Sequence, residues 1–276
     1  MLYYAGTVYF LRHEVRLRAK KHLGQNFLIN PHYIEKLAAS IHVAPGVPIL
    51  EIGPGKGAIT SLLAQKTDAL FAVEKDHEAV AYLRQTLASH RNITLIEADV
   101  LKFDLASIAV PETLMVAVGN LPYNIASPIM LKILRNNRFF SAGYFMLQRE
   151  VGDRLLARPR TKEYSFLTVA INTFARVHRL HLVPPGVFSP VPKVRSVFMH
   201  LAIRKETRLA DSDIDNYFSL VTTAFSQRRK KVINTLCHRY HEDKVRQFFS
   251  EGRIHDTARA EELSVDEYLG LFKAVS

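Results

Sequence analysis

The sequence predicts an α/β protein with a mostly parallel β-sheet, followed by a small all-helical C-terminal domain. From about residue 46 to 156, short apolar runs that are typical of buried strands alternate with segments of helical periodicity. This alternation favours a parallel sheet with right-handed crossovers and helices on both faces. Beyond a polar segment at 205–212, only helical patterns follow. In such sheets, ligands bind at the carboxyl ends of the strands.

The predicted elements follow one another in a regular order. A helix at 31–42 begins with Asn30 as its N-cap residue and Pro31 in its first turn. Two segments, 47–65 and 142–157, are each expected to begin as a strand and to end as a helix. Further strands are expected within 68–76, 92–100 and 112–123 and at about 194–203. Further helices are expected within 76–90 and 127–136.

We divide the chain into three parts. Residues 1–19 are predicted to be a basic N-terminal arm, 20–206 the sheet-containing domain and 207–276 the helical domain. In the arm, an apolar patch precedes the basic residues, which is the reverse of the order in a signal peptide. An Arg-rich organelle presequence is the alternative interpretation of this segment.

The composition bounds the class of protein. The 276 residues carry a formal net charge of +11, which would attract a polyanion such as a nucleic acid, although an ordinary basic protein has the same excess. The single cysteine, Cys237, excludes an internal disulfide and a cysteine metal cluster. No apolar run approaches the ~20 residues of a membrane span. We therefore expect a cytoplasmic protein with no membrane association and no metal.

A glycine-rich turn follows the first predicted strand of the sheet. In "EIGPGKG", Gly53, Gly55 and Gly57 allow a sharp turn and a close approach of the backbone to a ligand. The spacing differs from the G-x-G-x-x-G dinucleotide fingerprint, and the Gly-Lys-Ser/Thr ending of a P-loop is missing. A tight strand–helix turn without any ligand would use the same glycines.

Acidic residues end the next two predicted strands. Glu74 lies about 20 residues beyond the turn, where a carboxylate can accept both hydroxyl groups of a ribose. Asp99 ends the following strand, where it can accept a hydrogen bond from an adenine amine. Each residue taken alone fits a helix cap or a surface acid equally well. Together they indicate a pocket for an adenosine without phosphate, of which S-adenosyl-L-methionine is the common example.

The stretch "NLPY" closes the predicted strand at 112–123, beside the glycine turn. Asn120 and the Leu121 carbonyl could accept the two N–H groups of an amine on an aromatic base. Pro122 stiffens the turn, and Tyr123 could stack on the face of the base. The alternative is an ordinary strand-end turn in which Asn120 caps a helix and Tyr123 packs in the core.

Several motifs together resemble one family. The motifs "EIGPG" and "NLPY" look like those of the ribosomal RNA adenine N6-dimethyltransferases. The segments at 20–28 ("KKHLGQNFL"), 188–196 ("FSPVPKVRS") and 224–236 ("AFSQRRKKVINTL") resemble this family's cofactor lid, its second base-contacting loop and the start of its helical domain. The resemblance covers about 20–260 and implies a Rossmann-like, S-adenosyl-L-methionine-dependent methyltransferase.

The resemblance also implies roles for individual residues. Asn26 and Leu28 match lid contacts to the cofactor, Gly53 and Gly55 match its methionine side, Glu74 matches the ribose acid and Asp99 the adenine acid. On the substrate side, Asn120 matches the residue that holds the target amine and also borders the cofactor. Leu121 matches the residue whose carbonyl contacts the same amine. Tyr123 matches the aromatic residue that stacks on the target base, and Phe188 matches the one that packs on its other face.

The basic run at the start of the predicted helical domain is a candidate RNA-binding site. Such a run is more often a solvated helix face. At a domain junction it could instead bind RNA phosphates without reading sequence, together with basic residues near the N-terminus. The run consists of Arg228, Arg229, Lys230 and Lys231, and the N-terminal residues are Arg16, Arg18, Lys20 and Lys21.

Two branches of the family share these motifs. One dimethylates two adjacent adenosines in the 3′-terminal hairpin loop of small-subunit (16S) rRNA during ribosome assembly, and the other modifies large-subunit rRNA and confers macrolide resistance. The typical motif of the resistance branch reads Asn-Ile-Pro-Tyr, whereas this chain has Asn-Leu-Pro-Tyr at 120–123. We expect the first activity, by a monomer that acts on a pre-30S-type particle. A non-catalytic RNA-binding or transcription factor on the same fold is the third alternative.

Overall fold

The computed structural model describes residues 17, 19–20, 23–206, 208–252 and 254–276. The predicted N-terminal arm at 1–19 therefore lies almost wholly outside the described residues, and so does Thr207, where the helical domain was predicted to begin. Among the described residues, no helix combines the length and the apolar character that crossing a membrane requires.

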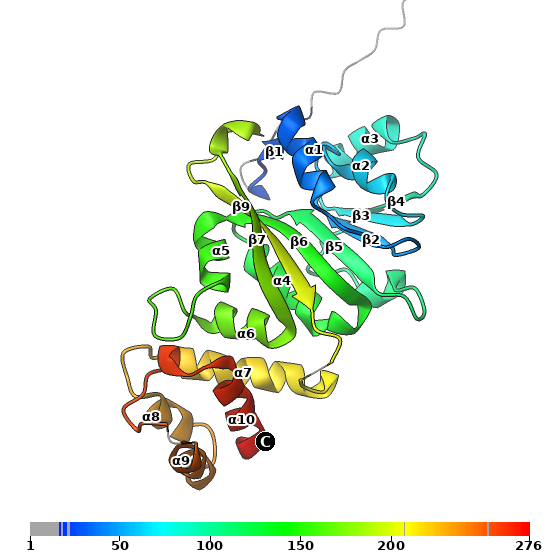
Figure 1. Ribbon diagram of the computed structural model, residues 1–276. Coiled ribbons are helices and arrows are strands. Elements are labelled where there is room, and N and C mark those ends of the chain that lie inside the picture. The colour runs from blue at the N-terminus through cyan, green and yellow to red at the C-terminus, as the bar shows by residue number, and fades with distance from the viewer. Residues whose placement is uncertain (1–16, 18, 21–22, 207, 253) are drawn as a thin grey trace, which may run out of the picture.

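A seven-stranded sheet forms the centre of the molecule (Figure 1). Its strand order is β4-β3-β2-β5-β6-β9-β7, in which β2 to β6 run parallel and β9 runs antiparallel to both of its neighbours. The predicted mostly parallel sheet is confirmed, and so is the position of the "NLPY" strand beside the glycine-turn strand. The strands are β2 (Ile49–Ile52), β3 (Leu70–Glu74), β4 (Ile93–Glu97), β5 (Met115–Asn120), β6 (Phe140–Gln148), β7 (Ala175–Val183) and β9 (Ser196–Ile203).

Helices cover both faces of this sheet (Figure 1). Ile49 faces an apolar cluster that includes Leu37 of α1 and Leu63 of α2, whereas Leu50 and Ile52 face a cluster built with α4 and α6. Alternate residues of a central strand thus enter separate cores, as the two-residue period of a strand requires. The helices are α1 (Pro31–Ala39), α2 (Thr60–Ala64), α3 (His77–Thr86), α4 (Ala126–Arg135), α5 (Arg149–Leu155) and α6 (Phe166–Phe174).

Side-chain caps begin helices α1 and α3. The Asn30 side chain accepts a hydrogen bond from the Tyr33 N–H at 3.1 Å, which confirms Asn30 as the N-cap of α1. Asp76 is the N-cap of α3, where its Oδ1 accepts from the Glu78 N–H at 3.1 Å. Both helices therefore begin at sharply defined points beside the carboxyl edge of the sheet.

The C-terminal part of the chain is helical and packs on α6 (Figure 1). Phe218 of α7 makes edge-on contacts with Phe166 and Phe174, and the Tyr217 hydroxyl lies 2.9 Å from Thr173 Oγ1. These residues belong to the same apolar cluster as one face of the sheet, so the helices extend an existing core. They are α7 (Ile214–Phe225), α8 (Val232–Cys237), α9 (Glu242–Glu251) and α10 (Val265–Val275).

Candidate active site

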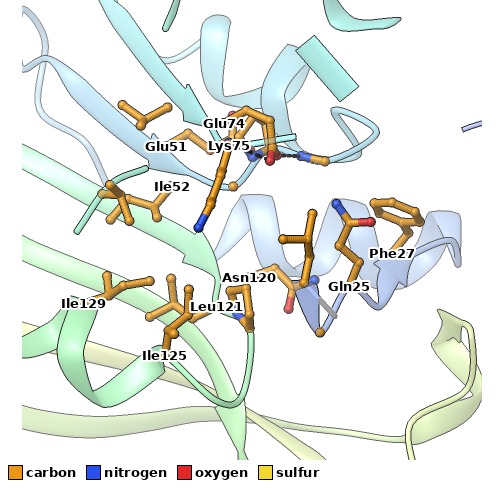
Figure 2. A pocket seen from close by; sticks show the side chains of 18 of the residues that line it. Gln25, Phe27, Glu51, Ile52, Glu74, Lys75, Asn120, Leu121, Ile125 and Ile129 are labelled. Carbon is orange, nitrogen blue, oxygen red and sulfur yellow. Dashed lines mark hydrogen bonds between the residues drawn. The ribbon is translucent and has the colours of Figure 1, made fainter. Parts of the chain in front are cut away.

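A single pocket at the carboxyl edge of the sheet gathers most of the predicted site residues (Figure 2). It lies between the glycine turn after β2, the ends of β3 and β5, and residues 23–28, which we call the strap. The strap ends in β1 (Phe27–Leu28), which pairs with β8 (Phe188–Ser189). The predicted residues that line the pocket are Asn26, Leu28, Gly53, Gly55, Glu74, Asp99, Asn120, Leu121 and Tyr123.

The glycine turn depends on backbone conformations that favour glycine. Gly53 has φ +67° and Gly55 has φ +58°, both in the left-handed region. A Cβ at Gly55 would lie 3.0 Å from the Phe27 ring of the strap, whereas a Cβ at Gly53 would meet nothing within 4 Å. Gly55 thus lets the strap approach, and Gly53 leaves open space at the pocket wall.

Glu74 is held by the backbone around it. Glu74 is 6% exposed. Its Oε2 atom accepts a hydrogen bond from the Gly55 N–H at 3.0 Å, and its Oε1 atom accepts from the N–H groups of Lys75 and Asp76 at 2.9 Å each. Burial raises the pKa of Glu74 above its usual range, and these three hydrogen bonds oppose that rise. The carboxyl group has one orientation, with lone pairs left for a ligand in the pocket.

Asp99 lies at a more solvent-exposed part of the carboxyl edge of the sheet. A hydrogen bond from the Lys75 ammonium to Oδ2, at 2.9 Å, lowers the pKa of Asp99, and Oδ1 accepts from the Leu101 N–H at 3.0 Å. Figure 2 shows the Lys75 side chain extending into the pocket. The pocket thus offers one carboxyl group held by backbone N–H groups, that of Glu74, and one paired with the exposed ammonium group of Lys75, that of Asp99.

A third carboxyl group, Glu51, lies in the pocket wall. It sits within the apolar strand β2, is 2% exposed, and its Oε2 has no hydrogen-bond partner among the described residues. Burial raises the pKa of Glu51 to about 8. An unpartnered buried oxygen at a pocket wall is costly unless a ligand supplies a donor.

The amide of Asn120 is oriented by the strap. Its Nδ2 donates to the Asn26 carbonyl at 2.9 Å, so the Oδ1 atom remains available as an acceptor on the pocket side. The neighbouring Gly119 leaves no room for a side chain, because a Cβ there would lie 2.6 Å from Leu121 Cδ2 and 3.0 Å from the Ile52 carbonyl. Close packing of β5 on β2 therefore sets where Asn120 leaves the sheet.

The rest of the "NLPY" loop is anchored to neighbouring strands. The Leu121 N–H donates to the Met146 carbonyl at 3.2 Å, and the Leu121 side chain is buried. The Tyr123 hydroxyl lies 3.0 Å from Oγ of Ser196, a fully buried residue of β9. Burial raises the pKa of Tyr123, so its hydroxyl is neutral at physiological pH. The ring is thus fixed at the pocket wall.

Comparison with known proteins assigns the chain to a family. A model of the family described as "Ribosomal RNA adenine dimethylase" matches residues 16–276. The chain belongs to the ribosomal RNA adenine dimethylase family. Proteins named "Ribosomal RNA small subunit methyltransferase A" from Geobacter sulfurreducens and Acinetobacter baylyi are 39% and 38% identical to it, over 94% and 92% of this chain and 96% and 91% of theirs. The predicted methyltransferase class is confirmed.

Solved structures agree with the fold of this dimethylase family member. The 23S rRNA methyltransferase ErmE is 27% identical, with a TM-score of 0.67 over 91% of this chain and 99% of that one. A dimethyladenosine transferase from Plasmodium falciparum superposes with a TM-score of 0.74 over 89% and 95% of the two chains at 22% identity, which supports the fold alone. The predicted Rossmann-like methyltransferase fold is confirmed.

Phe188 lies apart from the predicted site. It is 1% exposed in β8 and packs in the apolar cluster that contains Leu28 and Tyr144; it is absent from the pocket wall. The contact of Phe188 with the target base remains a prediction. The exposed apolar residues of the same loop are Val191 and Val194, at 65% and 43% exposure.

All four residues of the basic run of this dimethylase are exposed, but Arg228 differs from the other three in its contacts. Arg229, Lys230 and Lys231 are exposed, as a phosphate-binding role requires. Arg228 instead donates to Glu261 Oε2 from both Nε and Nη2, at 3.0 and 2.7 Å, and to the carbonyls of Lys162 and Tyr164. Its guanidinium joins the helical part of the chain to the loop before α6.

Four residues of the pocket region have contacts that the sequence-based prediction missed. Glu51, Lys75 and Gln25 had no individual role in it, whereas Lys20 was predicted to bind RNA phosphates with Arg16, Arg18 and Lys21, which lie outside the described residues. Glu51 and Lys75 line the pocket, while Lys20 and Gln25 join the N-terminal end of the strap to Asp76. An acidic residue within the apolar run "ILEI" is a usable signal for Glu51. The contacts of Lys20 and Gln25 span more than 50 residues and leave no local pattern.

Proposed function

We propose that this protein transfers methyl groups to the N6 atoms of two adjacent adenosines in the 3′-terminal hairpin loop of small-subunit rRNA, within an assembling small ribosomal subunit. The observation that carries the proposal is the oriented Asn120 amide, which offers Oδ1 to a pocket with three carboxyl groups in its wall. Relatives 38–39% identical carry the name of a small-subunit rRNA methyltransferase.

The pocket suits a cofactor with positive charge and no phosphate. The cofactor is S-adenosyl-L-methionine, which supplies an electrophilic methyl group on a positively charged sulfur. Glu74 would accept the ribose hydroxyls, and Asp99 the adenine amine. The unpartnered Oε2 of Glu51 lies in the same wall and would accept a hydrogen bond from the cofactor's ammonium group. Asn26 and Leu28 would cover the cofactor from the strap, and Gly53 and Gly55 would border its methionine part.

Asn120 and Leu121 would prepare the target amine. The lone pair of an adenine amine is delocalised into the ring, so the nitrogen is a poor nucleophile. Asn120 Oδ1 and the Leu121 carbonyl would accept its two N–H groups and favour a tetrahedral nitrogen whose lone pair is directed at the methyl group. Such positioning contributes much of a transfer that needs no prior proton abstraction. The amine loses its proton after transfer.

The remaining residues would hold the base and the RNA. Tyr123, anchored through its hydroxyl to Ser196, would stack on the adenine face. Phe188 would pack on the other face after movement of its loop. Arg229, Lys230 and Lys231 would bind RNA phosphates, which position the substrate without reading its sequence. We place the enzyme in the cytoplasm as a monomer.

Methyl transfer to isolated ribosomal subunits tests the proposal. Labelled S-adenosyl-L-methionine is incubated with undermethylated small subunits, with naked small-subunit rRNA and, in parallel, with large subunits. We expect label as N6,N6-dimethyladenosine in the small-subunit particle, and a loss of about 10²–10³-fold in rate for Asn120→Ala. Asn124→Ala is the matched control, because it removes an exposed amide from the same loop outside the pocket wall.

The other outcomes separate the alternatives. Label confined to large-subunit RNA would assign the protein to the resistance branch, for which the similarity to ErmE is the supporting observation. Absence of label in both subunits, with S-adenosyl-L-methionine still bound, would indicate a binding factor. Equal rates for Asn120→Ala and Asn124→Ala would contradict the role of the Asn120 amide.

A further inference from the structure

Three donors converge on one buried carboxyl group beside the pocket. Asp76, whose side chain is fully buried, accepts from Lys20 Nζ at 2.7 Å, from Gln25 Nε2 at 2.9 Å and from the Glu78 N–H at 3.1 Å. The last bond is the helix cap, which any Asp or Asn provides. The first two bonds come from the N-terminal side of the strap and have no part in capping.

The two strap-side donors are also joined to each other. The backbone N–H of Lys20 donates to Gln25 Oε1 at 2.8 Å, so the Gln25 amide is held at both of its polar atoms. Lys20 Nζ lies 3.1 Å from Glu78 as well. Burial would raise the pKa of Asp76, but the bonds from Lys20, Gln25 and Glu78 outweigh it and lower that pKa. The carboxylate is therefore charged when it holds the strap.

The strap carries this attachment to the catalytic loop. Asn26 follows Gln25 directly, and its carbonyl accepts the Asn120 Nδ2 bond of 2.9 Å that orients the amide. The next residue, Phe27, packs against Ala79 of α3 and lies at contact distance from Gly55. A path of direct contacts thus runs from Asp76 through Gln25 and Asn26 to Asn120.

We propose that Asp76, Lys20 and Gln25 form a clasp that holds the strap over the pocket and thereby positions the Asn120 amide for catalysis. Asp76 and Lys20 are positioning residues, because they act through the strap. When the clasp is broken, the Asn26 carbonyl loses its fixed position and the Asn120 amide is free to rotate. The clasp therefore affects both retention of the cofactor and the rate of transfer.

Asp76→Asn breaks the clasp and preserves the helix cap. Asn is as good an N-cap residue as Asp, but it has no charge for Lys20, and its amide offers Gln25 a second donor. Asp104→Asn is the matched control, since Asp104 caps a short helix through Ala106 in the same manner, is exposed and lies outside the pocket wall. Lys20→Met is a second variant that leaves Asp76 in place.

Hydrogen exchange of the cofactor-free protein tests the clasp without any turnover. We expect the peptide that covers 23–30 to exchange about tenfold faster in Asp76→Asn and in Lys20→Met than in the wild type and in Asp104→Asn. Peptides from the sheet should exchange equally in all four proteins. Unchanged exchange of the strap in both clasp variants would refute the proposal.

Kinetics test the link to Asn120. The link between the clasp and Asn120 rests on the proposed methyl transfer. The hydrogen-exchange result does not depend on it, and it tests the clasp even if the protein transfers no methyl group. We expect Asp76→Asn to raise KM for the cofactor and to lower kcat, each by about tenfold. Faster strap exchange with kcat unchanged would show that the clasp retains the strap without orienting Asn120. Loss of activity together with faster exchange throughout the sheet would show a structural defect and would also overturn the proposal for Asp76.

Discussion

The pocket edge and the basic run differ in what holds their charged side chains. Glu74 is nearly buried and its carboxyl group is held by three backbone N–H groups. Arg229 and its lysine neighbours are exposed, and Arg228, although exposed as well, donates to Glu261 and two carbonyls. A charge held by backbone donors keeps its geometry before a ligand arrives. An exposed charge serves association and is screened by salt.

The largest effect is expected at Glu51, the most deeply buried carboxyl group of the pocket. The pKa of Glu51 is about 8 in the folded protein, compared with 4.5 for an ordinary carboxyl group. Between these values the folded state holds a proton that the unfolded chain has released, so stability falls by about 1.4 kcal/mol per pH unit as the pH rises.

Glu51→Gln should abolish this component of the pH dependence. Urea unfolding of both proteins at pH 5, 7 and 8 measures it: similar stabilities are expected at pH 5, with the variant increasingly the more stable at higher pH. Parallel curves across the range would show that the Glu51 carboxyl ionises normally in the folded protein.

Two acidic residues of the pocket wall, Glu74 and Asp99, test the effect of burial on the proposed binding of the cofactor. In Glu74→Gln an NH₂ group would replace one carboxylate oxygen and meet backbone N–H donors, so binding of S-adenosylhomocysteine should weaken about 100-fold. In Asp99→Asn the remaining oxygen can still accept a hydrogen bond from the adenine amine, so binding of S-adenosylhomocysteine should weaken only about tenfold. Calorimetric titration of each variant gives both values. Equal losses would mean that burial does not distinguish the two acids.

Neighbouring arginines of the basic run should behave in opposite ways. Arg228→Met leaves Glu261 and two carbonyls without a donor, so we expect a loss of about 1–2 kcal/mol in stability and little change in the salt dependence of RNA binding. Arg229→Met should leave stability unchanged and reduce the slope of log affinity against log salt by about 1. Thermal unfolding and RNA titrations at several salt concentrations measure both. A reduced slope in Arg228→Met would show that its guanidinium reaches phosphate.

The smallest effect is expected where the strap joins α1. Asn30→Ala removes the hydrogen bond to the Tyr33 N–H and should lower the free energy of unfolding by about 1 kcal/mol. Methyl transfer at a temperature where both proteins are folded should be unchanged. Asn30→Asp, which preserves the cap, is the control. A marked fall in methyl transfer for Asn30→Ala, but not for Asn30→Asp, would show that the cap of α1 also helps to position the active site.

The features that the sequence did not predict have several physical causes. Strand β7 lies at the sheet edge, so its polar residues Arg176, His178 and Arg179 interrupt any apolar run. The hydrogen bonds of Arg228 depend on Glu261, more than 30 residues away. Phe188 was predicted to meet the target base, yet its side chain is buried in a core that only the folded chain brings together.

The sequence by itself determined the parallel sheet, the position of the "NLPY" strand beside the glycine-turn strand and the shared edge of Gly53, Glu74, Asp99 and Asn120. These follow from local periodicity, because topology places the carboxyl ends of parallel strands together. Only the tertiary structure decided which atoms of these residues remain available. The strap engages Asn120 Nδ2, Lys75 engages Asp99, and Asp76 engages Lys20 and Gln25. Such contacts between distant segments depend on distances of about 3 Å, which no spacing along the chain specifies.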